Sequence, residues 1–230
     1  MKLDVQNLPS VYVSPFLPWE PKRAWLRVRT QHAFHPFHVT TRLCLEIFWI
    51  WRGRLFFDEA RVLDVGCGTG ILALVAAKLG ARWCVGVDVA REAIGRSREN
   101  SEANGLQERV NWVHGSIEAI GGTFHTVVAN VPWACWEALF DNIVDCVAEG
   151  GALVASGFQD LQAPLLESFL HQQGFLVLER RQGDLTFFGV PPSGSFTWCA
   201  LLAARGTMDG ASPTSAIGNS QNRGRREEFA

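Results

Sequence analysis

Three glycines in five residues follow a short apolar run in VLDVGCGTGILALVAAKLGA, residues 62–81. Gly66, Gly68 and Gly70 lack a Cβ, so the backbone can approach a ligand closely and turn sharply into a helix. Their G-x-G-x-G spacing differs from the dinucleotide fingerprint G-x-G-x-x-G, because the third glycine is not in register. A pyrophosphate requires a helix N-terminus aimed at it, so this tighter loop favours a ligand without phosphates.

A second chemical signal ends the next apolar run, WCVGVD, at Asp88. A carboxylate there can accept two hydrogen bonds from ribose hydroxyls. Since the carboxyl ends of parallel strands meet at one edge of a sheet, we expect the glycine loop and Asp88 to form a nucleoside site.

A third signal is the stretch ANVPW, in which Asn130 ends an apolar run. The side-chain oxygen of Asn130 and the carbonyl of Val131 can each accept an N–H from a methyl acceptor. Pro132 would stiffen the loop, and Trp133 offers a face to a flat group or an amine. The Asn-x-Pro-aromatic pattern resembles the acceptor motif of enzymes that methylate amino groups of bases or glutamine amides.

Strand-like and helix-like stretches alternate after Arg61, which predicts repeated βαβ units. We expect strands at 62–65, 83–88, from 109, at 124–131 and from 152, and helices at 71–79, 91–104, 136–148 and 161–172. Two further strands, in FLVLERRQGDLTFFGV and SFTWCALLAAR, have no helix between them. The predicted fold is therefore α/β and Rossmann-like, with a mostly parallel seven-stranded sheet, an antiparallel edge strand and helices on both faces.

The chain divides into three predicted regions. Residues 1–38 are rich in proline and aromatic residues and form an extended arm with a short strand around 25–28. The core domain covers residues 39–205 and begins with the helix VTTRLCLEIFWIW, for which Thr40 or Thr41 offers an N-cap. Residues 206–230 form a polar tail that we expect to be disordered.

Composition excludes several classes of protein. The net charge of −2, from 21 basic and 23 acidic residues, gives no footprint for general nucleic-acid binding. The six cysteines form no C-x-x-C pair, which favours reduced thiols in a cytoplasmic protein without a secretory signal. The run IFWIW is too short to span a membrane. His32, His35 and His38 lack the accompanying cysteine or acid of a zinc site, so no metal is expected.

Together these motifs resemble a known family. LDVGCGTG followed by VGVDVAREAI is similar to the first two motifs of class I S-adenosylmethionine-dependent methyltransferases. HVTTRLCLE, GILALVAAKLGA, RENSEANG, VVANV and SGF resemble the family that methylates lysines and the N-terminus of a large-subunit ribosomal protein. The resemblance implies S-adenosylmethionine as cofactor, bound by Thr41, Asp64, Gly66, Cys67, Gly68, Gly70, Asp88, Val89, Ser116 and Asn130. It further implies that 39–205 is a methyltransferase domain.

The same resemblance assigns roles to individual residues. Asp88 holds the ribose, and Thr41 lies in the helix start that borders the cofactor. Ser116 stands near the position where many relatives place an acid for the adenine amino group, and its hydroxyl could accept that hydrogen bond. The acceptor is expected at Asn130, Pro132 and Trp133.

Three features differ from the family pattern. The family carries a separate N-terminal substrate-recognition domain, and 38 residues before VTTR are too few for one, so we expect the chain to lack it. HAFHPF replaces a glycine-rich segment, and Asn-Val-Pro-Trp replaces Asn-Ile-aliphatic. A base for a lysine acceptor is not evident, with His38 and Glu46 as guesses.

The predicted function is an N-methyltransferase acting on an unidentified protein substrate, at a lysine or N-terminal amine. An acceptor on a small molecule, a nucleobase or an amide is the alternative. A non-catalytic binding protein on this fold and a nicotinamide-dependent oxidoreductase are the alternatives from other classes. No membrane association is expected, nucleic acid is not favoured, and the oligomeric state is open.

Overall fold

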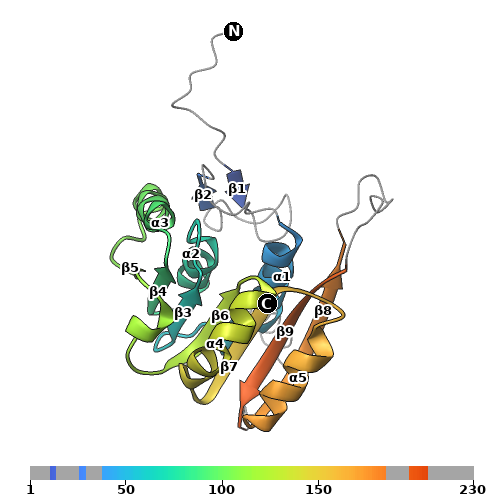
Figure 1. The fold of residues 1–230 in the computed structure, drawn as a ribbon. Helices are drawn as coiled ribbons and strands as arrows, with labels where there is room; N and C mark the ends of the chain where they lie inside the picture. Colours follow the sequence, from blue (N-terminus) through green and yellow to red (C-terminus); the bar gives the residue numbers. More distant parts are fainter. Residues whose placement is uncertain (1–10, 14–25, 30–37, 185–196, 207–230) are drawn as a thin grey trace, which may run out of the picture.

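A computed structural model of the chain describes residues 11–13, 26–29, 38–184 and 197–206 (Figure 1). The strands are β1 (Val11–Val13), β2 (Leu26–Val28), β3 (Arg61–Val65), β4 (Trp83–Asp88), β5 (Val110–His114), β6 (Phe124–Asn130), β7 (Val147–Gln159), β8 (Phe175–Gly183) and β9 (Trp198–Arg205). The helices are α1 (Val39–Leu55), α2 (Ile71–Lys78), α3 (Arg91–Ala103), α4 (Trp133–Asp145) and α5 (Ala163–Gln172), with a 3₁₀ turn at Ile117–Ala119.

Seven strands form one sheet in the order β5-β4-β3-β6-β7-β9-β8. The five strands from β5 to β7 are parallel, β9 runs antiparallel to β7, and the edge strand β8 runs antiparallel to β9. The predicted Rossmann-like α/β sheet with an antiparallel edge is therefore confirmed. A separate pair, β1 and β2, is antiparallel.

Alternation along the strands divides the core between two faces of the sheet. On β3, Val62 packs with α1 and α2, whereas Leu63 packs with α4 and α5. This follows from the period of two in a strand, because both faces of a parallel sheet are covered by helices. Figure 1 shows the same arrangement, with α4 and α5 in front of the sheet and α1 and α2 behind it.

Several predicted boundaries differ from the structure. Helix α1 is capped by His38, whose side chain accepts a hydrogen bond from the Thr40 amide, so neither Thr40 nor Thr41 is the cap. Helix α4 begins at Trp133, three residues earlier than predicted, because Pro132 in the cap position cannot donate to a strand and suits a helix start.

Strand β7 begins at Val147, before the glycine pair that predicts the end of a helix. Val147 pairs with Phe124, and the register then shifts before Ala152. Gly150 has a φ of 71°, so the glycines form an irregularity within the strand.

The predictions for the N-terminal arm and the C-terminal tail can be compared with the structure only in part. The predicted strand near 25–28 is present as β2, whereas residues 1–10, 14–25, 30–37 and 207–230 lie outside the described residues. Within the described part of the chain, no helix is long and apolar enough to cross a membrane.

Candidate active site

The sheet reverses its strand order between β3 and β6, which is where α/β folds open a crevice for ligands. The glycine loop follows β3, and Asn130 ends β6, so the topology places both predicted motifs at this crevice. A pocket lies here, lined by Thr41, Asp64, Gly66, Cys67, Gly68, Thr69, Ile71, Leu72 and Asn130.

The glycine loop requires residues without a side chain. Gly66, Gly68 and Gly70 have φ values of 67°, 55° and 78°, in the left-handed region that favours glycine. A Cβ on Gly66 would lie 2.6 Å from Val131 Cγ1, and one on Gly70 would lie 2.4 Å from the ring of Trp112. Val131 and Trp112 thus pack tightly against the loop, while Gly66, Cys67, Gly68 and Thr69 line the pocket.

Asp88 lies beside this loop at the end of β4. Its Oδ2 accepts a hydrogen bond from the Gly68 amide at 2.9 Å, and its Oδ1 accepts one from the Ala90 amide at 2.9 Å. Two backbone donors fix the carboxylate, whose remaining lone pairs can accept ribose hydroxyls. Val89 follows with a side chain that is 72% exposed.

Ser116 occupies the cap position of the 3₁₀ turn after β5. Its hydroxyl donates a hydrogen bond to Glu118, and this contact lowers the pKa of the exposed Glu118 carboxyl. The Ser116 oxygen keeps its lone pairs, so it can still accept a hydrogen bond from an adenine amino group.

Asp64 is the buried acid of the pocket, with 1% of its surface exposed. Burial raises the pKa of its carboxyl to about 7, although the Ala73 amide, which donates to Oδ2 at 3.0 Å, acts in the opposite direction. A positively charged ligand group in the pocket would therefore gain an anionic partner only once Asp64 has lost its proton.

Cys67 lines the same pocket but is not a nucleophile. Burial raises the pKa of its thiol well above the ordinary value, and the sulfur lies 3.8 Å from the Ser97 hydroxyl. A neutral thiol in this position packs against its neighbours and does not attack.

Asn130 carries an unsatisfied acceptor. Its Nδ2 donates to the Thr41 hydroxyl at 3.3 Å, while its buried Oδ1 accepts no hydrogen bond from the described residues. A buried amide oxygen without a donor costs about 1–3 kcal/mol. Thr41 fixes the orientation of the amide through Nδ2, which leaves Oδ1 without a donor among the described residues.

The loop after Asn130 is held by residues from β7 and α4. A Cβ on Gly157 would lie 2.1 Å from the Val131 carbonyl oxygen, and the Val131 amide donates to the Ser156 carbonyl at 3.2 Å. The Trp133 ring lies edge-on to Phe158 with 6.2 Å between centroids. Phe158 is fully buried, so this contact ties the start of α4 to the core behind the loop.

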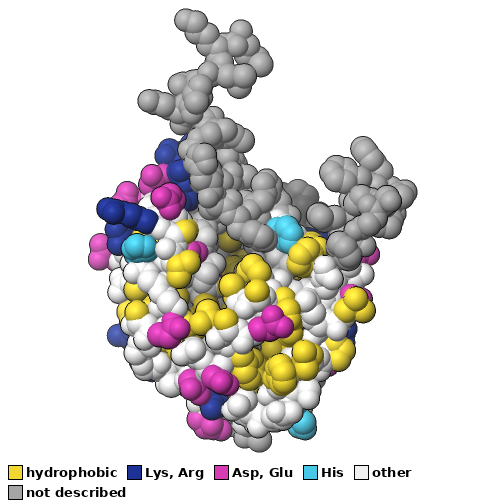
Figure 2. Space-filling view, viewed as in Figure 1, with side chains coloured by type: hydrophobic (Ala, Val, Ile, Leu, Met, Phe, Trp, Pro, Cys, Tyr) yellow, Lys and Arg dark blue, Asp and Glu magenta, His cyan; other side chains and the backbone are white. Residues whose placement is uncertain are grey.

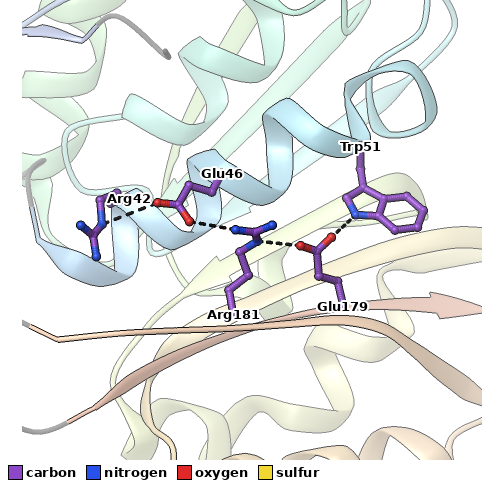
Figure 3. A network of polar contacts seen from close by, with 5 residues as sticks. All are labelled: Arg42, Glu46, Trp51, Glu179 and Arg181. Atoms are coloured by element: carbon purple, nitrogen blue, oxygen red, sulfur yellow. Dashed lines mark hydrogen bonds and ion pairs between the residues drawn. The ribbon is translucent and has the colours of Figure 1, made fainter. Parts of the chain in front are cut away.

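Helix α1, which presents Thr41, is fastened to the edge strand β8 by a polar network (Figure 3). Glu46 forms an ion pair with Arg42 at 3.7 Å and accepts a hydrogen bond from Arg181 at 3.2 Å. Arg181 also contacts Glu179 at 2.6 Å, and Glu179 accepts from the indole of Trp51. The network fixes the helix against the sheet and thereby fixes Thr41 beside Asn130.

The two guesses for a general base are occupied elsewhere. The carboxylate of Glu46 forms ion pairs with Arg42 and Arg181 in the network between α1 and β8. His38 Nδ1 contacts the Thr40 hydroxyl at 2.8 Å and caps the helix, and its ring packs against Trp198. Neither residue lines the pocket.

The pocket brings together six of the predicted cofactor residues, namely Thr41, Asp64, Gly66, Cys67, Gly68 and Asn130. Gly70 caps α2, and Asp88 joins the loop through Gly68. Val89 and Ser116 lie at neighbouring strand ends outside the pocket lining. Three lining residues, Thr69, Ile71 and Leu72, were not predicted from the sequence. Trp112 and Gly157 were given no role, although the stretch SGF, which contains Gly157, resembles the family.

Comparison with known proteins identifies the family of the chain. The family model described as ribosomal protein L11 methyltransferase (PrmA) matches residues 33–184, which is more than half of the chain. The chain belongs to this family. Its members are class I methyltransferases that use S-adenosylmethionine.

Individual relatives support the assignment. The ribosomal protein L11 methyltransferase of Xylella fastidiosa is 45% identical over 124 residues, covering 52% of this chain and 39% of the relative. That of Hamiltonella defensa is 32% identical over 173 residues, covering 75% and 51%. The chain thus spans about half the length, or less, of the curated relatives it matches.

A solved structure, that of a ribosomal protein L11 methylase from Lactobacillus delbrueckii, superposes with a TM-score of 0.61. Its sequence is 26% identical, and the match covers 74% of this chain and 80% of that chain. A putative RNA methyltransferase from Pyrococcus horikoshii has a TM-score of 0.62 at 18% identity, and the match covers 77% of this chain and 88% of that chain, which shows the shared fold alone.

Proposed function

We propose that this chain is an S-adenosylmethionine-dependent N-methyltransferase that acts on a protein amine, either a lysine or an N-terminus. Family membership supports the reaction class. The observation that carries the choice of nitrogen as acceptor is the buried, unpaired Oδ1 of Asn130 in the wall of the pocket.

The residues of the pocket fit the cofactor. Gly66 and Gly68 let the backbone line the pocket, Asp88 presents a fixed carboxylate for the ribose, and Asp64 offers a buried acid. When bound, S-adenosylmethionine supplies a methyl carbon attached to a positively charged sulfur. A neutral nitrogen of the acceptor attacks this carbon, and the sulfur leaves as a neutral thioether.

The protein's contribution is alignment and the exclusion of water. Asn130 Oδ1 accepts an N–H of the acceptor amine, which leaves the nitrogen lone pair free. Trp133, which is half-buried at the start of α4, supplies an apolar surface near the acceptor loop. An amine of ordinary pKa, ~10.4 for lysine, must be neutral to react. Neither Glu46 nor His38 lines the pocket, so we expect activity to rise with pH as more of the amine becomes neutral.

Ribosomal protein L11 is the first substrate to test, because the relatives are named for it. The chain's mixed surface charge also favours a protein over a long nucleic acid. On the face seen in Figure 2, acidic side chains and arginines or lysines are interspersed among the described residues.

A small molecule, nucleobase or amide is the second candidate, favoured by Trp133. The indole is half-buried at the start of α4, where it could pack against a flat group. Transfer of a labelled methyl group from S-adenosylmethionine to free bases and small amines tests this candidate.

Calorimetric titration with S-adenosylhomocysteine tests the cofactor assignment, with NADH as a control. We expect Asp88→Ala to weaken binding by about 10- to 100-fold, because charge-assisted hydrogen bonds are lost. Asp88→Asn, which keeps one acceptor oxygen, should lie between. Equal affinity in all three proteins would refute the ribose role.

Transfer of a labelled methyl group to ribosomal protein L11 tests the acceptor assignment. Asn130→Ala should reduce turnover by about 100-fold while the affinity for S-adenosylhomocysteine stays within a few fold. Thr41→Val should have a smaller effect of the same kind, because it removes only the group that orients the amide. Unchanged turnover in Asn130→Ala would show that the acceptor binds elsewhere.

A further inference from the structure

The two asparagines of RENSEANG, Asn100 and Asn104, receive no role from the proposed reaction. Asn100 lies on the last turns of α3 and is fully buried, and Asn104 is the C-cap residue of the helix. Both amides face β2, the strand of the N-terminal arm, which lies outside the region that matches the family.

The side-chain amide of each asparagine bonds the backbone N–H and C=O of one arm residue, which is Arg27 in β2 or Arg29 just after it. The Arg27 amide donates to Asn104 Oδ1 at 2.8 Å, and Asn104 Nδ2 donates to the Arg27 carbonyl at 2.7 Å. The Arg29 amide donates to Asn100 Oδ1 at 2.8 Å, and Asn100 Nδ2 donates to the Arg29 carbonyl at 3.1 Å. The two side chains thus act like peptide groups of a neighbouring strand.

The spacing explains why a helix can replace a strand here. Residues four apart on a helix are separated by about 6.0 Å along its axis, and residues two apart on a strand by about 6.6 Å. Asn100 and Asn104 therefore match Arg27 and Arg29. On the other edge β2 pairs with β1, and the buried side chains of Leu26 and Val28 pack into the core beside α1 and α2.

Asn100 also reaches the glycine loop. Its Nδ2 donates to the Thr69 carbonyl at 2.9 Å, so a single amide contacts both the arm and the loop. In the same region the Ser97 hydroxyl donates to the Gly68 carbonyl at 2.9 Å. The Asn104 amide instead donates to the carbonyls of Arg27 and Asn100, and it makes no such bond to the loop within the described part of the chain.

We propose that docking of β2 on α3 holds the Asn100 amide in the orientation that fixes the glycine loop, so that the arm and the cofactor site are coupled through Asn100. Asn100 is a positioning residue and touches no reacting atom. The coupling rests on the proposed use of S-adenosylmethionine. Because coupling between sites is reciprocal, cofactor binding also stabilises docking of the arm.

A backbone substitution on the arm tests this without altering any atom of the loop. Arg29→Pro deletes the N–H that donates to Asn100 Oδ1, whereas Arg29→Ala keeps it and serves as the matched control. The Arg29 side chain is exposed. We expect Arg29→Pro to weaken S-adenosylhomocysteine binding by about 5- to 30-fold, within the range typical of coupled sites, and Arg29→Ala by less than about twofold.

A double-mutant cycle identifies the residue that carries the effect. In an Asn100→Ala background, Arg29→Pro should cause little further loss of affinity, because the connection is already broken. Hydrogen exchange of the ligand-free protein should show faster exchange in the peptide that contains residues 66–74 for Arg29→Pro than for Arg29→Ala. This local readout separates loss of coupling from a general loss of stability.

The outcomes are distinct. If the wild-type chain binds S-adenosylhomocysteine and Arg29→Pro binds it equally well with unchanged exchange in the loop, the coupling is refuted and the proposed function stands. Full additivity of Arg29→Pro and Asn100→Ala would also refute coupling through Asn100. If the wild-type chain binds no S-adenosylhomocysteine, the proposed function fails and the coupling fails with it.

Discussion

At the scale of single residues, two aspartates beside the same loop lie in opposite environments. Asp88 is partly exposed and accepts two backbone amides, whereas Asp64 is buried and accepts one. Desolvation disfavours the charged form of a carboxyl, and this explains the raised pKa of Asp64. Both residues are aspartates in adjacent motifs, so the sequence alone does not show that their burial and pKa values differ.

The raised pKa of Asp64 predicts how stability depends on pH. Between about pH 4 and pH 7 the folded protein holds a proton that the unfolded chain has released, so the free energy of unfolding falls as pH rises through this window. Asp64→Asn keeps an acceptor for the Ala73 amide and removes the titration. We expect the variant to gain stability relative to wild type, by roughly 4 kcal/mol at most, between pH 4 and pH 8.

Urea unfolding of both proteins without ligand, at several pH values, measures this difference. The gain should be present at pH 8 and absent near pH 4. Parallel stability curves for the two proteins across this range would mean that Asp64 is ionised when buried, contrary to the prediction.

The roles of other residues could not be predicted from sequence, for a geometric reason. Asn130 can be identified because it ends a strand at the crevice, and its position follows from chain order. Gly157 and Asn100 act on segments distant in sequence, the Val131 carbonyl and the arm. Such contacts depend on strand register and helix orientation, which local patterns do not specify.

At the scale of elements, β7 supports the acceptor loop through Gly157. The residue has a φ of 93°, and a Cβ would lie 2.1 Å from the Val131 carbonyl oxygen, a contact that no side-chain rotation can relieve. We expect Gly157→Ala to lower the free energy of unfolding by more than about 3 kcal/mol and to reduce turnover, because Asn130 precedes the displaced peptide.

Gly105→Ala is the matched control for this substitution. Gly105 has a φ of 65°, but a Cβ added there would meet nothing within 4 Å, so the cost should be only about 1–2 kcal/mol for the left-handed conformation. Denaturant unfolding and methyl transfer are measured for both variants. Similar losses of stability would show that conformation, and not the contact with Val131, decides the effect.

The polar network between α1 and β8 predicts how much Arg181 contributes to the stability of the fold. Arg181 contacts both Glu46 and Glu179 and is only one-third exposed, whereas Arg82 and Glu59 form an isolated pair on the surface (Figure 3 shows the network). We expect Arg181→Met to lower the free energy of unfolding by about 1–2 kcal/mol and Arg82→Met by less than about 0.5 kcal/mol.

Urea unfolding at low and high NaCl distinguishes charge from packing in this network. The loss in Arg181→Met should shrink at high salt, since mobile ions screen partly exposed pairs. A loss that does not change with salt would assign the effect to the aliphatic part of Arg181.

The elements also show what sequence patterns can and cannot predict. Strand β4 has the bounds that the sequence predicts, because Asp88 and a glycine turn delimit a continuous apolar run. The start of α4 differs from the prediction because the proline before it is equally typical of a loop. A proline at a helix N-terminus and a proline in a loop look alike until the hydrogen bonds of the strand before it are known.

At the scale of the whole molecule, buried cysteines lie in both cores, on either side of the sheet. Cys44, Cys67 and Cys84 belong to the core beneath α1 and α2, and Cys146 and Cys199 to the core beneath α4 and α5. Burial raises the pKa of all five thiols, to about 12 for Cys44 and about 11 for Cys199. Their reactivity therefore reports opening of either core.

We expect one thiol per folded chain, that of Cys135 on α4, to react quickly with a disulfide reagent at pH 8, because it alone is partly exposed. Cys135→Ser should abolish the fast phase, and urea should expose the remaining five. Since the sheet is shared by both cores, these five should become reactive together, at the rate of global unfolding. Separate rates for Cys44 and Cys199 would instead show that the two faces of the sheet open independently.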